Sequence, residues 1–97
     1  MQLRYLIFDA SDDGDGTGTW DAMASVRAAD VPALLAEVQT VLATAERQAP
    51  GPRGPLDEGG TWDADVQQHT DGDWTTVTLT VTGPWAWGEA LFERLGG

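Results

Sequence analysis

The stretch from Thr61 to Val81 reads TWDADVQQHTDGDWTTVTLTV, and it decides the fold of this 97-residue chain. Apolar and polar residues alternate on both sides of Asp71-Gly72, a dipeptide favoured at the two central positions of a type I′ hairpin turn. Alternation with a period of two is typical of strands that bury one face. The stretch therefore predicts an antiparallel hairpin with one apolar and one polar face.

Counting outward from Asp71-Gly72 gives a register for this predicted hairpin. The register pairs apolar residues on one face, namely Val66 with Val77, Ala64 with Leu79 and Trp62 with Val81. The other face then carries polar and acidic side chains, which are Asp63, Asp65, Gln67, Thr76, Thr78 and Thr80. The same register sets His69 opposite Trp74 on that polar face. Turn chemistry and hydrophobic alternation agree, which supports the assignment.

Two further strands are expected in the first third of the chain. Residues 3–8 are short and rich in aromatic and branched side chains, which indicates a first strand. Residues 19–27 alternate, with Trp20 and Val26 on the apolar side and Asp21 on the polar side. Aspartate and glycine dominate residues 9–18, so we expect an acidic, glycine-rich loop there.

Two helices complete the predicted order of elements. Apolar residues recur at helical spacing from about Val31 to Arg47, with Asp30 as the expected N-cap and Pro32 in the first turn. Residues 84–95 are apolar at four-residue steps and predict a second helix. Residues 49–60 hold three prolines and four glycines, which favours a long surface loop.

The expected order β-β-α-β-β-α defines the fold class. A four-stranded antiparallel sheet with two helices packed on one face would bury both helical stripes and the apolar sheet face in one core. The sequence therefore predicts a single α+β domain over residues 1–97, a length typical of one domain.

Charge and composition narrow the classes of partner. Sixteen acidic residues stand against five arginines, with no lysine and no cysteine, and the net charge is -11. Such a field repels nucleic acid and anionic membranes. It either favours a basic protein partner or serves only to keep the protein in solution. No apolar run approaches the roughly 20 residues of a membrane span, and no secretory signal is recognised. We expect a cytoplasmic protein, and arginine without lysine suggests a GC-rich bacterial genome.

The segment DGDGT at residues 13–17 resembles the centre of an EF-hand calcium loop. That family needs a glycine at position six of the loop and a bidentate glutamate at position twelve. When Gly16 takes position six, position twelve falls on Ala22, which has no ligand oxygen. We therefore expect a hairpin loop, and the weak metal candidates are Asp9, Asp13 and Asp15.

The last residues, Leu95-Gly96-Gly97, are similar to the tail of ubiquitin-like sulfur carriers. These are small acidic proteins that are activated at a terminal Gly-Gly, so the resemblance implies a carrier function for Gly96 and Gly97. Glycine is also the ordinary residue just past a helix end, and the second predicted helix runs up to it. A helix stop is the other interpretation.

The five tryptophans divide into three groups. Trp20 and Trp62 fall on inward faces and are expected in the core. Trp85 and Trp87 lie about 200° apart around a helix, so both cannot point inward. Trp74 points away from the helices, and an outward tryptophan is a common anchor of protein interfaces.

The function expected from these observations is binding, not catalysis. No arranged nucleophile and base, no metal-ligand set and no cofactor motif stands out. The candidate partner-binding residues lie on the polar sheet face and are Trp74, His69, Asp63, Asp65 and Asp21. The expected partner is a basic protein, as for an immunity protein or inhibitor, or a second copy of the chain as a homodimer.

Overall fold

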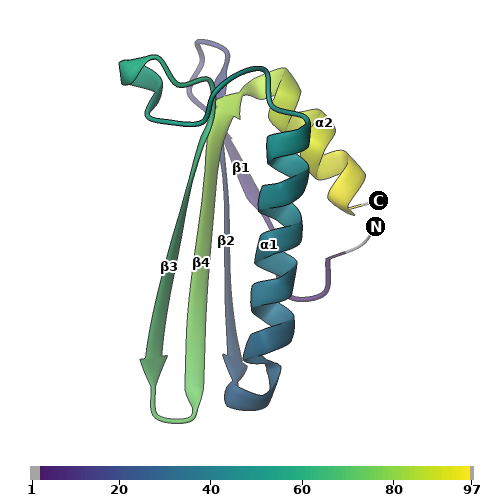
Figure 1. Cartoon of the computed structure of the whole chain (residues 1–97), viewed down its shortest axis with the longest axis vertical. Coiled ribbons are helices and arrows are strands. Elements are labelled where there is room, and N and C mark those ends of the chain that lie inside the picture. The colour runs from purple at the N-terminus through teal and green to yellow at the C-terminus, as the bar shows by residue number, and fades with distance from the viewer. Residues whose placement is uncertain (1–2, 97) are drawn as a thin grey trace.

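The computed structural model of the chain describes residues 3–96. Four antiparallel strands form one sheet in the order β1-β2-β4-β3, and two helices pack on one face of it (Figure 1). The predicted α+β class and the order β-β-α-β-β-α are confirmed. The elements are β1 (Asp9–Asp12), β2 (Thr17–Arg27), α1 (Val31–Arg47), β3 (Asp63–Asp71), β4 (Trp74–Pro84) and α2 (Trp85–Gly96), with short 3-10 turns at Ala28–Asp30 and Leu56–Glu58.

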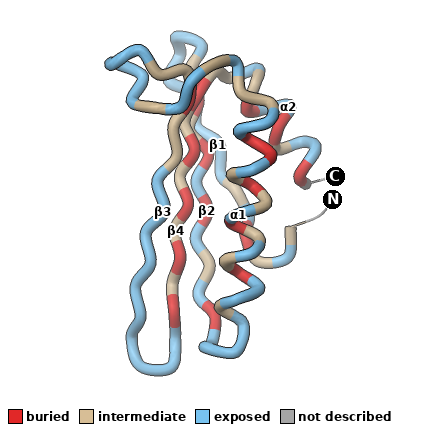
Figure 2. Tube along the Cα trace, in the orientation of Figure 1, coloured by how far each residue is buried: buried red, intermediate tan, exposed pale blue. Residues whose placement is uncertain are grey.

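The core lies between the sheet and the two helices. Buried residues alternate along β4, while β3 is exposed over most of its length (Figure 2). Complete burial of each aliphatic side chain contributes about 1.5–3 kcal/mol to stability. The largest fully buried side chains are Trp62, Leu34, Leu79, Leu91, Leu95, Val38, Val41, Val77 and Val81.

The first strand is not where the sequence pattern put it. Residues 3–8 form no strand, and β1 instead occupies Asp9–Asp12, inside the segment expected to be a loop. The backbone N–H groups of residues 4–6 donate to the carboxylate of Glu37 on α1, so this segment does not need a strand partner. Most of its apolar side chains pack on the core: Leu6 is buried, and the ring of Phe8 lies 4.4 Å from that of Phe92, whereas Ile7 is 81% exposed.

The predicted hairpin forms, but its register differs from the expected one by two residues. Gly72 and Asp73 are the central pair, so Val66 lies opposite Leu79 and His69 lies opposite Thr76, not Trp74. Gly72 has φ +62° and Asp73 does not have a positive φ, which is the pattern of a type II′ turn rather than the expected I′ turn. A shift of two residues leaves every side chain on its predicted face.

The two helices match the sequence pattern closely. α1 spans Val31–Arg47 as predicted, with Pro32 in its first turn. Asp30 occupies the N-cap position but makes no capping hydrogen bond with its side chain, so that expectation was wrong. α2 begins at Trp85, whose N–H donates to the carbonyl of Gly16 at 2.8 Å.

Four of the five tryptophans form two pairs at one end of the sheet. Trp20 and Trp62 are buried, as predicted. Trp85 stacks on Trp20 with ring centroids 5.3 Å apart, and Trp87 packs at a tilt on Trp62 at 5.6 Å. Each α2 tryptophan is only half-buried, so α2 straddles the sheet end and contacts one core tryptophan with each side.

Candidate partner-binding face

The five candidate residues lie on one surface, the sheet face opposite the helices, which we call the outer face. One row across it contains Asp9, Asp21, Thr80 and Asp65, each a cross-strand neighbour of the next. Neighbouring strands lie about 4.8 Å apart, so Asp21 and Asp65, separated by β4, are roughly 10 Å apart at the backbone. These carboxylates flank the strand between them and do not converge on one point.

A column of threonines on β4 separates the two acidic strands. Thr76, Thr78, Thr80 and Thr82 follow one another on the outer face and are half-buried. The Oγ of Ser25 and the Oγ1 of Thr76 share a hydrogen bond of 2.6 Å across the β2–β4 pair. Branched side chains with few rotamers make this column a stiff surface.

Apolar exposure on the outer face is concentrated in two residues. Trp74 is 46% exposed and Met23 is 69% exposed. The guanidinium carbon of Arg27 lies 4.7 Å from the centroid of the Trp74 ring, so a cation covers one side of the indole. Trp74 is also the direct cross-strand partner of Asp71.

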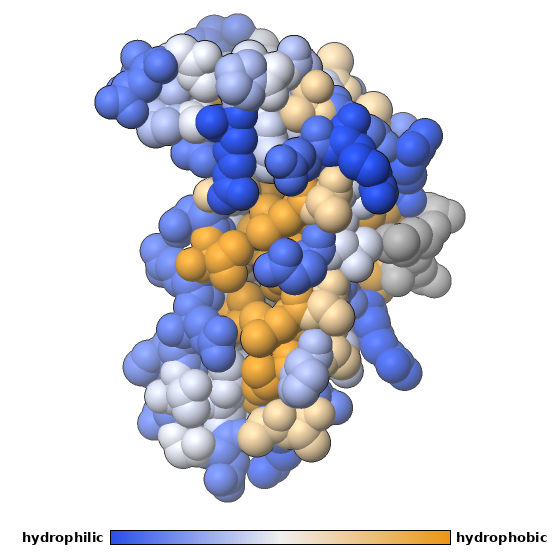
Figure 3. Space-filling model, viewed as in Figure 1, coloured by the Kyte–Doolittle hydropathy of each residue, from blue (hydrophilic) through white to orange (hydrophobic). Residues whose placement is uncertain are grey.

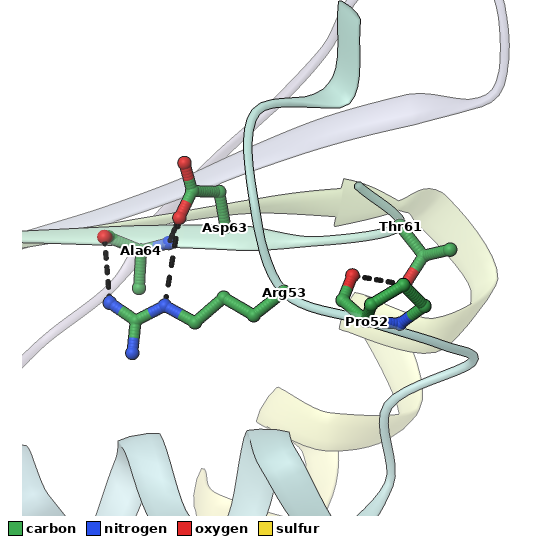
Figure 4. A network of polar contacts seen from close by, with 5 residues as sticks. All are labelled: Pro52, Arg53, Thr61, Asp63 and Ala64. Atoms are coloured by element: carbon green, nitrogen blue, oxygen red, sulfur yellow. Dashed lines mark hydrogen bonds and ion pairs between the residues drawn. The ribbon is translucent and has the colours of Figure 1, made fainter. Parts of the chain in front are cut away.

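The proline- and glycine-rich loop does not cover this part of the face. It lies at the opposite end of β3 from Trp74, where Arg53 reaches Asp63 and Ala64 (Figure 4). The Nε of Arg53 is 3.6 Å from the carboxylate of Asp63 and its Nη2 donates to the carbonyl of Ala64 at 3.0 Å. Thr61 ties the same loop through a hydrogen bond from its Oγ1 to the carbonyl of Pro52.

Asp63 therefore differs from the other candidates. Its Oδ1 accepts the N–H of Ala64 at 2.9 Å and also faces Arg53. With Asp65 and two threonines it lines only a shallow depression of about 80 Å³. The carboxylate of Asp63 already contacts the loop through Arg53, whereas the carboxylate of Asp65 accepts a hydrogen bond from the Gln67 side chain at 3.1 Å.

His69 is exposed near the tip of the β3–β4 hairpin. Its direct cross-strand neighbour is Thr76, and Trp74 lies on the diagonal. Diagonal neighbours are about 7–8 Å apart, within reach of aromatic side chains. The imidazole is thus on the same surface as Trp74 and Asp71 but is not stacked directly across from the indole.

The weak metal candidates are divided between two places. Asp13 turns its Oδ1 onto the N–H groups of Asp15 and Thr17, at 3.1 and 3.2 Å, within a loop shaped by the positive φ of Gly14 and Gly16. Asp9 lies away from them on β1. Within residues 3–96, no group of three or more acidic or histidine side chains could hold a metal ion. The calcium hypothesis stays a prediction.

The loop carboxylates influence each other. A side-chain hydrogen bond with Asp15 lowers the pKa of Asp13, and the same hydrogen bond together with the charge of Asp13 raises the pKa of Asp15. Both groups are fully in water. The hydrogen bond favours the ionised form of Asp13 and the protonated form of Asp15, which is why the two pKa values move in opposite directions.

The C-terminal glycines are only partly within the structure. α2 continues through Gly96, and Gly97 lies outside the described residues. The expectation of a helix reaching the glycines is confirmed as far as Gly96. The sulfur-carrier hypothesis stays a prediction.

A larger depression, of about 330 Å³, separates the N-terminal segment from α1. Glu37 lines this depression, and its carboxylate accepts hydrogen bonds from the N–H groups of Arg4, Tyr5 and Leu6 at 2.7–3.2 Å. These bonds fasten residues 3–8 to the helix. A carboxylate committed to three backbone donors is a structural clasp, so we assign no ligand to this depression.

Comparison of the chain with known proteins gave no match, so the proposed function is argued from the geometry of the outer face. No family model, no curated protein and no solved structure matches the chain. None of the helices in residues 3–96 has the length and apolar character that a membrane crossing needs.

Two outer-face residues were missed by sequence reasoning. The alternation of residues 19–27 already set Met23 and Arg27 beside Asp21 on the polar side, so a signal was present. Their importance depends on strand order, because β2 lies next to β4 and brings Arg27 onto Trp74. Strand order is not encoded in the alternation.

Proposed function

We propose that this protein is a non-catalytic binding module that contacts a basic partner protein through its outer face. The observation that carries the proposal is the exposed Trp74, bracketed by Arg27 and Asp71 on a face that the helices leave free. Tryptophan is enriched among the residues that dominate interface energies, because its large ring is buried with little loss of rotamer freedom.

The charge of the chain supports a cationic partner. A net charge of -11 attracts positive surfaces over several ångströms and raises the association rate at low salt. The same charge works against a second copy of the chain, since two equal negative fields repel. Within the proposal, the carboxylates of Asp9, Asp21 and Asp65 attract the partner at long range. Trp74 and Met23 supply the apolar contact that holds the bound partner.

An immunity-like or inhibitor-like role toward a basic toxin or nuclease fits this division of labour. Such inhibitors block an enzyme by covering its cationic substrate site, and they need no chemistry of their own. A bacterial cytoplasm as the setting of this action is part of the same proposal, and the use of arginine without lysine supports the bacterial origin.

The test is comparative affinity capture followed by a binding measurement. The wild type, a Trp74→Ala/Met23→Ala variant and a control Leu56→Ala variant serve as baits in lysate of the native host at low ionic strength. Leu56 is also an exposed apolar residue, at 37%, but it lies in the loop near the other end of the sheet. The expected result is a basic protein retained by the wild type and the control and bound at least about tenfold more weakly by the outer-face variant.

Equal retention of the partner by all three baits would refute the outer face as the contact surface. A captured protein of acidic character would contradict the electrostatic part of the proposal. Binding of the purified partner should also weaken as salt is raised, since screening shortens the reach of the charges.

A further inference from the structure

The backbone of β3 presents hydrogen-bonding groups to an open sheet edge. Asp71 and Trp74 flank a two-residue turn and so form a hydrogen-bonded pair. In an antiparallel ladder such pairs alternate with pairs whose N–H and C=O groups point away from the partner strand. The odd-numbered residues of β3 therefore bond to β4, and the even-numbered residues point their backbone groups outward.

Contacts at the upper end of β3 agree with this alternation. The carbonyl of Trp62 accepts the N–H of Gly54 at 2.8 Å, and the carbonyl of Ala64 accepts the Arg53 guanidinium at 3.0 Å. The loop thus covers the first outward-pointing groups, as Figure 4 shows for Arg53.

The lower half of the same edge is open. Val66, Gln68 and Thr70 are the next residues whose backbone groups point outward, and no other element of the described chain runs beside them (Figures 1 and 2). Natural edge strands are usually protected by proline, lysine, a bulge or an inward-pointing charge. Residues 66–70 carry none of these, and their pairing with β4 is continuous.

The inner side of this edge is partly apolar. On α1, Glu37 marks the flank that faces the N-terminal segment, so the opposite flank, with Leu35 and Leu42, faces β3. Figure 3 shows a band of apolar surface between α1 and the β3 side of the sheet. Val66 shares the inner side of the sheet with Leu79 and is 40% exposed, so the described chain leaves part of its side chain free to contact an added strand.

The outer side of the edge is acidic at both ends of the open stretch. Asp65 and Asp71 lie on the outer face, with Gln67 and His69 between them. A strand laid against this edge would set one side chain opposite each of these four residues. Basic residues are favoured opposite the two aspartates, and neutral polar residues opposite Gln67 and His69.

We propose that the open edge of β3 takes up an extended strand of a basic partner protein, which pairs with residues 65–71 and extends the sheet by one strand. The incoming strand carries basic residues six positions apart on the outer side and small apolar residues on the inner side. This inference rests on the proposed function, because it names how the same basic partner docks. Main-chain hydrogen bonds supply affinity, and the alternate side chains supply specificity.

A synthetic peptide tests the edge without knowledge of the partner. The probe is a capped peptide of the same length as the stretch from Asp65 to Asp71. It has arginine at both ends, valine at its three even-numbered positions and threonine at the two remaining positions. Binding to the full chain is followed by amide NMR at low salt. The expected result is shifted amide signals along β3, with slowed hydrogen exchange at Val66, Gln68 and Thr70.

Backbone methylation separates strand pairing from charge attraction. In antiparallel pairing the three valines lie opposite Val66, Gln68 and Thr70, and their N–H groups bond to β3. Methylating these three nitrogens removes those donors, so binding should weaken at least about tenfold. Methylating the two threonine nitrogens removes N–H groups that point away and is the matched control, with binding retained. Equal binding of the parent peptide and both methylated peptides would overturn strand pairing.

Variants of the protein distinguish failure of the edge from failure of the outer face. Gln68→Lys places an inward charge on the exposed edge and should abolish peptide pairing, while Gln39→Lys adds the same charge on the exposed side of α1 and should not. If the natural partner is lost by Trp74→Ala but kept by Gln68→Lys, the proposed function stands and the edge inference fails. A dimer of the free protein that Gln68→Lys dissociates would also overturn it, because a second copy would then occupy the edge.

Discussion

Removal of the Glu37 carboxylate should detach the N-terminal segment from α1. The carboxylate oxygens accept the N–H groups of Arg4 at 2.8 Å, Tyr5 at 3.0 and 3.2 Å and Leu6 at 2.7 Å. A hydrogen bond to a charged group contributes about 1.5–3 kcal/mol, and the bonds to Tyr5 and Leu6 are partly buried. The bond to Arg4 is exposed and adds little.

The free energy of unfolding should therefore fall by about 2–4 kcal/mol in Glu37→Ala, after the regained chain entropy of the released segment is set against the lost bonds. For a domain of this length, each kcal/mol corresponds to about 4–8 °C in Tm. Urea denaturation measures the change in the free energy of unfolding, and hydrogen exchange shows which amides lose protection. Exchange should accelerate first at residues 4–6, while the amides of β4 keep their protection under native conditions.

The matched control is Glu46→Ala, which removes one negative charge from an exposed position on the same helix. Its free energy of unfolding should change by less than about 0.5 kcal/mol. If Glu37→Ala behaved like this control, the carboxylate would not be the clasp that holds residues 3–8. The placement of Leu6 in the core would then need another cause.

Three further predictions concern packing, charge and the outer face. Gly88→Ala should lower the free energy of unfolding, measured in urea, by about 1–3 kcal/mol, because an added Cβ would overlap the buried Trp20 ring. Unchanged stability would mean that Trp20 can move aside. Carbon-13 NMR should show Asp13 losing its proton at lower pH than Asp15, and Asp13→Asn should move the Asp15 titration to lower pH; the opposite order would contradict the shared hydrogen bond. Because folding lowers the pKa of Asp13, this group stabilises the folded state above the pKa that it has in the unfolded chain, and the contribution is lost as the pH falls. Because folding raises the pKa of Asp15, its contribution is present below the pKa of the unfolded chain and is lost as the pH rises, so the two contributions to stability oppose each other. Trp74→Ala should lower the free energy of unfolding by less than about 1.5 kcal/mol in thermal unfolding, since its contact with Arg27 is exposed; a larger loss would make it a structural residue rather than a free anchor.

Local pattern was enough to predict the helices and the faces of β2, β3 and β4. The bounds of α1 follow from the periodicity of its apolar residues, and the inward positions of Trp20 and Trp62 follow from strand alternation. Even a wrong turn assignment at residues 71–73 left each side chain on its proper face, because the error was two residues and the strand period is also two.

Long-range partners explain what the pattern could not predict. Residues 3–8 have a typical strand composition, yet their backbone donors are satisfied by Glu37, more than 30 positions away in the sequence. The polar segment Asp9–Asp12 becomes a strand because it can pair with Gly18–Asp21 across a short turn. Composition describes what a segment can do, and the available partner decides which option it takes.

The two candidate surfaces adjoin because the helices and the loop leave neighbouring parts of the sheet uncovered. The helices cover one sheet face, and the loop of residues 48–62 covers the upper edge of β3. What remains uncovered near the hairpin tip is the lower edge of β3 and the part of the outer face around Trp74, and the two meet at the cross-strand pair Asp71–Trp74. A strand added at the edge would lie next to Asp71, one strand spacing from β3 and about 10 Å from the backbone of Trp74. A single partner that contributed a strand and the segment following it could therefore reach both surfaces, and loss of either one should weaken the same complex.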